Sequence, residues 1–300
     1  MKKPKEEMLK DFLQFVETKV SLNTENLIGN SNEIEKSMAH TSLASSKMIR
    51  AALLIASGKL NESIHESSLI TLASAVEMMH SYSLIHDDLP CMDDDDFRRS
   101  KPANHIVFGE ANAVLAGDAL QALAFETIAN DKHLSNEQKI KSIKILSSAC
   151  GKNGMIYGQH LDIENEQNSD LDLIELDNIH YLKTGRLIES SIFLGQVGSN
   201  LCEIDSKRLN IFSANIGLAF QIKDDVLDVT GSSETLGKSS MSDKKNNKST
   251  YVNIVGVDNS INRYNALVKD AIIALDKISF NSKSHNYLKD LAEYIIKREK

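Results

Sequence analysis

Two aspartate-rich stretches in distant parts of the sequence carry the chemistry that this chain most clearly indicates. They contain Asp87, Asp88 and Asp93 in the first and Asp224, Asp225 and Asp228 in the second. Carboxylates this dense repel one another, so a fold that keeps two such stretches is expected to hold cations between them. Hard oxygen ligands favour Mg²⁺, which binds through a few carboxylates and completes its coordination with water and substrate phosphates. The pattern therefore predicts a phosphate ester bridged to the protein by magnesium.

Helical spacing decides which carboxylates of the second stretch can act together. Asp224 and Asp228 are four residues apart and share one face of a helix, with Gln221 one turn earlier on nearly the same side. Asp225 is turned about 100° away from them. One acidic stretch alone could equally be a solvated helix end or an interaction loop, but two stretches favour a metal site.

The first stretch lies at the end of an apolar segment with helical spacing. His80 and Asp87 are seven residues apart and fall nearly on one line of that helix. Pro90 is expected to end or bend the helix and to bring Asp93 back by a loop. A histidine on an apolar face is, by itself, most often a hydrogen-bonded core residue, so only its place beside the acidic stretch favours a role in binding.

Composition predicts a mainly helical protein, because the 300 residues include only 3 Pro and 14 Gly. The net charge of −8 argues against general nucleic-acid binding, which needs a basic face. We find no signal-peptide core and no stretch that approaches the ~18 apolar residues of a membrane span. A cytoplasmic protein without a membrane span is therefore expected. The three cysteines are widely spaced and indicate neither a disulfide framework nor a zinc site.

Apolar residues recur at helical spacing almost throughout, as in Leu69, Leu72, Ala73 and Val76. Polar, glycine-containing breaks are expected at 29–32, 58–61, 90–102, 130–136, 165–170, 198–205, 231–249 and 281–284. They separate roughly ten helices with short connections. With no repeat or linker, residues 1–300 are predicted to form a single all-α domain. The long break at 231–249 directly follows the second acidic stretch and is expected to be a functional lid or disordered.

Further motifs join the two acidic stretches in a fixed order. They are the run 108–120, Gly158-Gln159 with Asp162, Leu182-Lys183-Thr184-Gly185, Gly237-Lys238, and Lys248-Ser249-Thr250-Tyr251. Over nearly the whole chain this order resembles the trans-prenyltransferases, the short-chain isoprenyl diphosphate synthases, and among them the bacterial enzymes with a fifteen-carbon product. An aspartate motif alone is shared with terpene cyclases, whereas the ordered set is far more specific. The resemblance implies an all-α isoprenoid-synthase bundle around a central prenyl pocket.

The resemblance also implies an activity. The enzyme would condense isopentenyl diphosphate with dimethylallyl and geranyl diphosphate to give (2E,6E)-farnesyl diphosphate, by ionisation, condensation and elimination, as a magnesium-dependent homodimer. The nearest alternative is a geranylgeranyl diphosphate synthase, which adds one more five-carbon unit. A second alternative is a non-catalytic partner subunit of the same family. Such a subunit would be expected to lose aspartates, and both motifs are complete here.

Site residues follow from the resemblance position by position. Asp87, Asp93 and Asp224 would be the main ligands of three Mg²⁺ ions, with Asp88, Asp225 and Asp228 in support. The other contacts of the allylic diphosphate would be Arg98, Lys183, Gln221, Lys238 and Lys248. The pocket for isopentenyl diphosphate would consist of Lys47, Arg50, His80 and Arg99. The carbonyl of Lys183, the hydroxyl of Thr184 and the amide of Gln221 could stabilise an allylic cation by their dipoles.

The isopentenyl pocket departs from the usual pattern of the family. That pattern reads Gly-Gly-Lys-Arg-x-Arg-Pro, whereas residues 45–51 of this chain read Ser-Ser-Lys-Met-Ile-Arg-Ala. Lys47 and Arg50 are kept, but one arginine and both glycines are not. The affinity or shape of this pocket is therefore expected to differ.

Tyr82 is the candidate for setting product length. It lies five residues before Asp87, but a helical wheel places Ser83 nearer to the Asp87 face, so spacing alone does not select it. The resemblance does, because farnesyl synthases of this type carry an aromatic residue here and geranylgeranyl synthases a smaller one. The alternative is a tyrosine that simply packs in a helix interface.

Overall fold

Helices make up nearly all of the regular structure in the computed structural model, which describes residues 4–165, 171–230, 250–280 and 285–298. The first half of the chain contains α1 (Lys5–Ile28), α2 (Glu33–Ser42), α3 (Ile49–Lys59), α4 (Glu66–Asp87), α5 (Asn104–Phe108), α6 (Glu110–Ala129) and α7 (Asn136–Cys150). A short antiparallel hairpin, β1 (Phe97–Arg98) and β2 (Lys101–Pro102), follows α4. The all-α prediction is confirmed.

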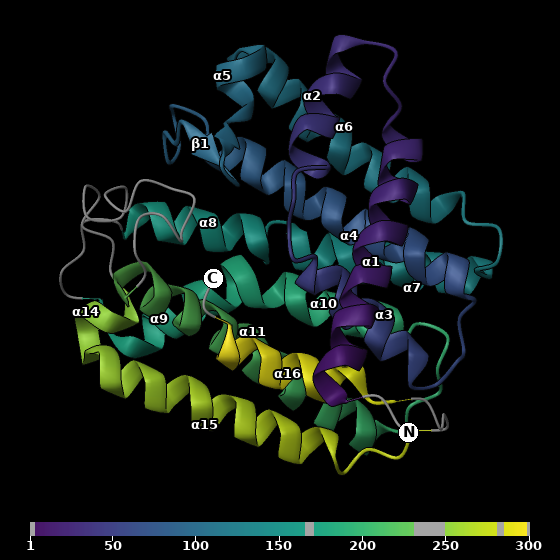
Figure 1. Cartoon of the computed structure of the whole chain (residues 1–300), viewed down its shortest axis with the longest axis vertical. Coiled ribbons are helices and arrows are strands. Elements are labelled where there is room, and N and C mark those ends of the chain that lie inside the picture. The colour runs from purple at the N-terminus through teal and green to yellow at the C-terminus, as the bar shows by residue number, and fades with distance from the viewer. Residues whose placement is uncertain (1–3, 166–170, 231–249, 281–284, 299–300) are drawn as a thin grey trace.

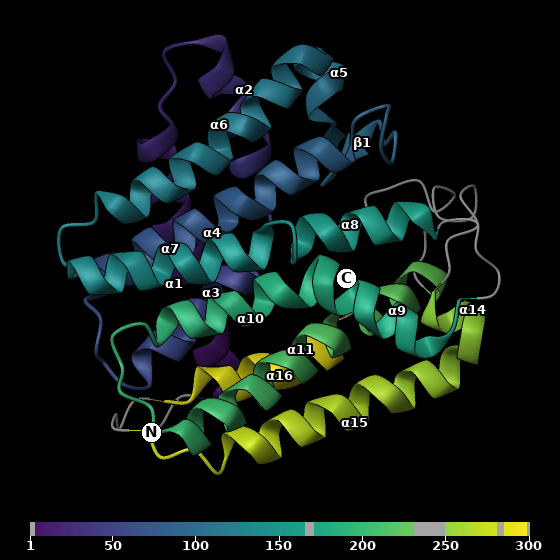
Figure 2. The same cartoon turned by 180° about the vertical axis from the view of Figure 1, so that it is seen from behind.

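The second half is also helical. It contains α8 (Met155–Glu164), α9 (Leu173–His180), the π-helix η1 (Tyr181–Gly185), α10 (Arg186–Gly195), α11 (Glu203–Thr230), α14 (Tyr251–Val255), α15 (Val257–Leu275) and α16 (Tyr287–Lys297). Figures 1 and 2 show α4 beside α6 at one end of the molecule and α11 beside α15 at the other. No helix in the described ranges carries an apolar stretch of the length that a bilayer requires.

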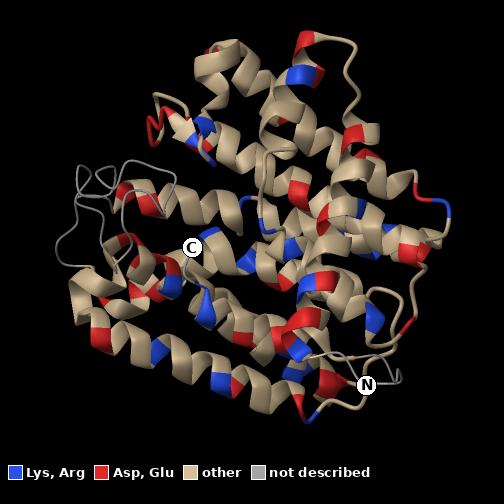
Figure 3. Cartoon of the chain, viewed as in Figure 1, with Lys and Arg blue, Asp and Glu red and all other residues tan. Residues whose placement is uncertain are grey.

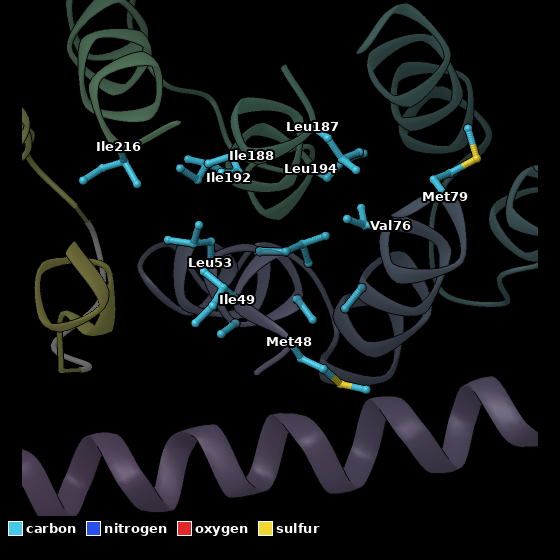
Figure 4. Packing of buried hydrophobic residues seen from close by; sticks show 14 of the residues in the cluster. Met48, Ile49, Leu53, Val76, Met79, Leu187, Ile188, Ile192, Leu194 and Ile216 are labelled. Atoms are coloured by element: carbon cyan, nitrogen blue, oxygen red, sulfur yellow. The ribbon is translucent and has the colours of Figure 1, made fainter. Parts of the chain in front are cut away.

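The core is built around α3, whose sequence is apolar on every side, as expected of a helix enclosed by others. Figure 4 shows Leu53 of α3 facing Ile188 and Ile192 of α10. The two helices touch at Gly195, where an added Cβ would lie 2.3 Å from the carbonyl oxygen of Leu54. A larger residue there would therefore force apart the two helices on which the site elements α4 and α11 rest.

Most predicted breaks coincide with the observed helix ends. Those at 29–32, 58–61, 90–102 and 130–136 are confirmed, and capping explains the start of α7, where Ser135 and Gln138 form a capping box. The breaks at 231–249 and 281–284 lie outside the described residues. The sequence did not predict the breaks at Gly109 and Gly256. Each is a single residue with positive φ, 82° and 81°, which ends one helix and begins the next.

Candidate active site

A cavity of about 910 Å³ opens between α4, α6, α8, η1 and α11, and both acidic stretches face it. In Figure 3 the acidic segments at the β1 turn and at the ends of α8 and α11 gather on one side of the molecule. The predicted site residues that line the cavity are Arg50, His80, Tyr82, Asp87, Asp93, Arg98, Lys183, Thr184, Gln221, Asp224, Asp225 and Asp228. Those that do not line it are Lys47, Asp88 and Arg99. Lys238 and Lys248 lie outside the described residues.

The first aspartate motif is formed where α4 ends. The helix stops at Asp87, and the backbone N–H of Asp93 donates to the carbonyl oxygen of Asp87 at 2.8 Å, so the loop returns as predicted. Asp88 is turned away from the cavity and is 1% exposed. It accepts a hydrogen bond from Nε of Arg98 at 2.8 Å, and the same guanidinium lies 3.2 Å from Asp95. Asp88 therefore holds Arg98 at the wall while Asp87 and Asp93 face the cavity.

Electrostatics distinguish Asp87 from an ordinary surface aspartate. Burial raises the pKa of Asp87 to about 6, although the positive charge of Lys183 opposes this shift. The neighbouring carboxylates of Asp93 and Asp88 add to it. Ionising this cluster is therefore unfavourable unless a cation joins it, which is the situation expected of metal ligands.

The second motif lies on the C-terminal part of α11. Asp224 and Asp228 are on one helix face, whereas Asp225 is 4% exposed and is bound to other parts of the protein. Its carboxylate accepts the backbone N–H of Tyr251 at 2.9 Å and lies 3.2 Å from Nε2 of His180. Asp225 thus ties α11 to α14 and to the end of α9. Its role as a metal ligand stays a prediction.

The π-helix η1 presents Lys183 and Thr184 to the cavity. This wide turn packs closely between α8 and α11, and a glycine on each helix permits the close approach. A Cβ added to Gly158 of α8 would lie 2.2 Å from the backbone N of Lys183. A Cβ added to Gly217 of α11 would lie 2.7 Å from Cα of Gly185. Short π-helical turns of this kind often occur at functional sites. The sequence motifs around these glycines gave no sign of the π-helix itself.

Two side-chain pairs are formed at this turn. The Thr184 hydroxyl donates to Oε1 of Gln221 at 2.8 Å, which joins η1 to α11. Nζ of Lys183 lies 2.6 Å from Oδ2 of Asp162 on α8. Asp162 belongs to a motif that the sequence analysis noted without giving it a role. The three groups expected to stabilise an allylic cation, at Lys183, Thr184 and Gln221, are therefore neighbours.

A second group of basic residues consists of Arg50 on α3, His80 on α4 and Arg99 in the turn between β1 and β2. Burial lowers the pKa of Arg50 and of Arg99, and burial together with these two charges lowers the pKa of His80 well below its ordinary value. His80 is therefore neutral at pH 7. The Nε of Arg50 is buried without a hydrogen-bond partner in the described part of the chain. Both arginines are half-buried, and a guanidinium group with a spare donor, such as that of Arg50, is suited to a phosphate bound without metal.

Glu77 is a residue of this pocket that the sequence analysis missed. It is 6% exposed, and Oε1 accepts the backbone N–H of Ala51 at 3.0 Å, at the start of α3. Its negative charge favours the protonated forms of Arg50 and Arg99. Its place in an apolar helical segment concealed it, because a carboxylate there is exceptional and the basic partners come from other segments.

The segment that departs from the family pattern turns sharply before α3. Met48 has left-handed backbone angles, φ 44° and ψ 43°, and only 5% of it is exposed. Figure 4 shows its side chain among the core residues. The position of the missing arginine is thus a core position in this protein, whereas Lys47 is exposed and its charge acts on Asp224.

Tyr82 lines the cavity on α4 and is 4% exposed. Its hydroxyl has no hydrogen-bond partner among the described residues, and its ring packs edge-on against His86 with centroids 5.7 Å apart. His86 is in turn held by α6, because Nε2 lies 3.1 Å from the carbonyl oxygen of Val114 and Gly117 leaves room for the imidazole. Tyr82 is therefore a fixed, bulky and apolar part of the wall.

The donor set fits magnesium. Asp87, Asp93 and Asp224 supply only hard carboxylate oxygens. Within the described ranges, no three carboxylate, histidine or cysteine groups are close enough to hold a metal ion by themselves. Mg²⁺ commonly binds proteins through one or two carboxylates and completes its coordination with phosphate oxygens and water.

Arg298, at the end of the described chain, was also missed. It lies on Asp224, with 2.5 Å between Nη2 and Oδ1. No local sequence signal could have shown this, since the contact depends on how α16 packs against α11. Gln159, which the sequence analysis named in a motif without giving it a role, lines the cavity, and neither its amide nitrogen nor its amide oxygen has a hydrogen-bond partner in the described part of the chain.

Comparisons with known proteins agree with this site. The Polyprenyl synthetase family model matches residues 31–283. Farnesyl diphosphate synthase of Micrococcus luteus is 42% identical over 273 residues, 90% of each chain, and geranylgeranyl diphosphate synthase of Cyanophora paradoxa is 43% identical over 244 residues, 81% of each. The crystal structure of geranyltransferase from Helicobacter pylori complexed with magnesium and isoprenyl diphosphate superposes with a TM-score of 0.79 at 30% identity, covering 99% of this chain and 98% of that one. This chain belongs to the polyprenyl synthetase family.

Proposed function

We propose that this protein condenses isopentenyl diphosphate with dimethylallyl and then geranyl diphosphate to give (2E,6E)-farnesyl diphosphate. One observation carries the proposal. A single cavity joins two aspartate motifs, suited to a diphosphate with Mg²⁺, to the half-buried Arg50, whose guanidinium is suited to a diphosphate without metal. A terpene cyclase acts on one diphosphate and would have no use for the second site.

On the metal side, Asp87, Asp93 and Asp224 would hold up to three Mg²⁺ ions, with Asp88, Asp225 and Asp228 in support. Magnesium, when bound, neutralises the diphosphate oxygens and makes that group a better leaving group. Arg98 and Lys183 would add charge at the same diphosphate, together with Gln221 and with Lys238 and Lys248, which the structure does not describe. The magnesium and isoprenyl diphosphate bound to the Helicobacter pylori relative support this assignment.

The reacting carbons would lie between the two diphosphate sites. When the carbon–oxygen bond of the allylic diphosphate breaks, the dipoles of the Thr184 hydroxyl, the Lys183 carbonyl and the Gln221 amide stabilise the cation. Lys47, Arg50, His80 and Arg99 orient isopentenyl diphosphate so that its double bond attacks the allylic carbon. The new bond leaves a tertiary cation, which loses a proton to the departing diphosphate. No side chain has to act as a nucleophile.

Product length is the point on which similarity alone does not decide, because farnesyl and geranylgeranyl synthases match this chain at nearly equal identity. The buried ring of Tyr82 supports a fifteen-carbon product, since it closes the wall along which a longer chain would extend. A non-catalytic partner subunit is the less favoured alternative, because both aspartate motifs are complete and face the cavity.

Three further parts of the proposal rest on the family. The protein would act as a homodimer, in the cytoplasm, with residues 1–300 as one domain. The alignment with the Micrococcus luteus relative over 90% of both chains supports the single domain.

Incubation of the purified protein with Mg²⁺, dimethylallyl diphosphate and isopentenyl diphosphate tests the proposal, with chromatography of the dephosphorylated products as the readout. Farnesol as the main product is expected, and none should form when EDTA replaces Mg²⁺. Geranylgeraniol as the main product would replace the proposal by its nearest alternative. Absence of any elongated product would support the partner-subunit alternative.

A further inference from the structure

The last helix returns the C-terminal end of the chain to the second aspartate motif. Arg298 directly follows α16 and is 8% exposed. Nη2 donates to Oδ1 of Asp224 at 2.5 Å and to the carbonyl oxygen of Phe220 at 3.0 Å. The guanidinium also lies over the ring of Phe220, 3.9 Å from its centroid. In Figure 1 α16, which Arg298 follows, lies beside α11.

These contacts form a built site rather than a surface ion pair. An exposed arginine gains little from a carboxylate, because water screens the charges and both side chains lose freedom. Arg298 is instead enclosed, with one charged partner, one backbone acceptor and one aromatic face, a combination that fixes the guanidinium plane. Asp224 is 34% exposed, so its carboxylate meets Arg298 on one side and faces the cavity with the rest.

Asp224 is also the residue proposed to lead the second metal motif, and a cation already lies on it. We propose that Arg298 is the resident counter-ion of Asp224, and that it makes metal binding at the second motif depend on diphosphate. This inference rests on the proposed function, because that function gives Asp224 its metal. Arg298 would act as a positioning residue, without contact with the reacting carbons.

The dependence on diphosphate follows from charge. A dication that binds Asp224 alone must either displace the guanidinium from its enclosed position or remain beside it, and both are unfavourable. A diphosphate that enters with the metal brings several negative charges, which compensate both cations and offer Arg298 a new acceptor. Binding of a metal ion alone at Asp224 is therefore disfavoured, whereas binding of the metal ion together with diphosphate is not.

Binding of Mn²⁺ measured by electron paramagnetic resonance tests this without turnover. The arms are wild type, Arg298→Met and the control Arg263→Met, each with and without inorganic pyrophosphate. Arg263 is matched because it is also an arginine in an ion pair, 3.4 Å from Asp177, but it is half exposed and far from the motifs in sequence. Without pyrophosphate, Arg298→Met should bind Mn²⁺ about tenfold more tightly than wild type, the effect of losing one charge-assisted hydrogen bond. With pyrophosphate, the two should agree within about threefold.

Unchanged or weaker Mn²⁺ binding by a folded Arg298→Met variant, in the absence of pyrophosphate, would overturn the proposal. So would an equal gain in Arg263→Met. If the methionine variant does not unfold cooperatively, Arg298→Gln provides the same comparison, because it keeps a donor for the Phe220 carbonyl. The product assay with wild type separates the two claims. If wild type makes farnesyl diphosphate but Arg298→Met binds Mn²⁺ no more tightly than wild type, only the counter-ion proposal is overturned. If wild type makes no product, the proposed function is overturned.

Discussion

Nζ of Lys183 lies 2.6 Å from Oδ2 of Asp162, so the lysine that the π-helix presents to the cavity is already paired across to α8. The positive charge of the same ammonium opposes the rise in the pKa of Asp87. Lys183 therefore has one acidic partner that orients it, and its charge also acts on the first aspartate motif. A diphosphate arriving with metal would find this charge in position.

Asp162→Asn should impair the use of the allylic substrate. The amide leaves Lys183 without its anionic anchor, and we expect KM for dimethylallyl diphosphate to rise about tenfold, which corresponds to one charge-assisted hydrogen bond. Steady-state kinetics of Asp162→Asn, Lys183→Met and the double variant provide the measurement. If the pair acts as a unit, the double variant should be little worse than Lys183→Met. Fully additive losses would show that Asp162 acts independently.

Asp87→Asn should lose at least about a hundredfold in kcat, because stabilisation of developing charge at the leaving group is among the largest catalytic contributions. The matched control is Asp94→Asn, in the same loop. Asp94 is exposed, does not line the cavity, and has a φ of 52°, which asparagine tolerates. Its rate should stay within about twofold of wild type. Near-normal turnover of Asp87→Asn would contradict the metal assignment.

The same variant should be more stable than wild type when metal is removed. The pKa of Asp87 is raised to about 6 in the folded protein, so ionising this carboxyl opposes folding at neutral pH. The penalty is fully present above the folded pKa of about 6, shrinks as the pH falls, and disappears below the ordinary pKa of 3.8, where the carboxyl is protonated in both states. With EDTA, Asp87→Asn should gain about 1–3 kcal/mol in free energy of unfolding at pH 7.5. Urea titrations at pH 7.5 and 4.5 measure the difference in free energy of unfolding between the variant and wild type. A gain in stability that does not shrink at pH 4.5 would show that it does not come from ionisation of Asp87.

Tyr82→Ala should shift the product from fifteen carbons to twenty or more, because removal of the buried ring extends the apolar wall. Tyr82→Phe should keep the fifteen-carbon product, since the hydroxyl makes no hydrogen bond within the described structure. Chromatography of the dephosphorylated products of both variants is the measurement. A fifteen-carbon product from Tyr82→Ala would mean that the tyrosine only packs in a helix interface.

Arg50→Ala should affect isopentenyl diphosphate far more than the allylic substrate. Arg50 is a half-buried cation whose Nε has no hydrogen-bond partner among the described residues, and residue 48 supplies no second arginine. We expect KM for isopentenyl diphosphate to rise about 10- to 100-fold, and KM for geranyl diphosphate to stay within about threefold. Glu77→Gln is a second variant to test. It removes the negative charge that favours the protonated form of Arg50, so it should also weaken the binding of isopentenyl diphosphate. Equal loss at both substrates would contradict the assignment of Arg50.

Several properties of this protein are determined by local sequence alone. Helical periodicity predicts the all-α fold, and the 3.6-residue repeat places Asp224 and Asp228 on one face and Asp225 on another. Proline chemistry predicts the end of α4, and the loop returns Asp93 to the carbonyl of Asp87. These outcomes depend on interactions within a few residues, which a sequence displays directly.

Tertiary packing decided the rest. The π-helix that presents Lys183 and Thr184 exists because Gly158 and Gly217 let α8 and α11 close on the same turn. Glu77 accepts the backbone N–H of Ala51 because α3 begins against α4, and Arg298 meets Asp224 because α16 returns to α11. Each contact joins residues far apart in the chain. Its energy depends on burial and on charges brought together by several helices, so no spacing within the sequence could have predicted it.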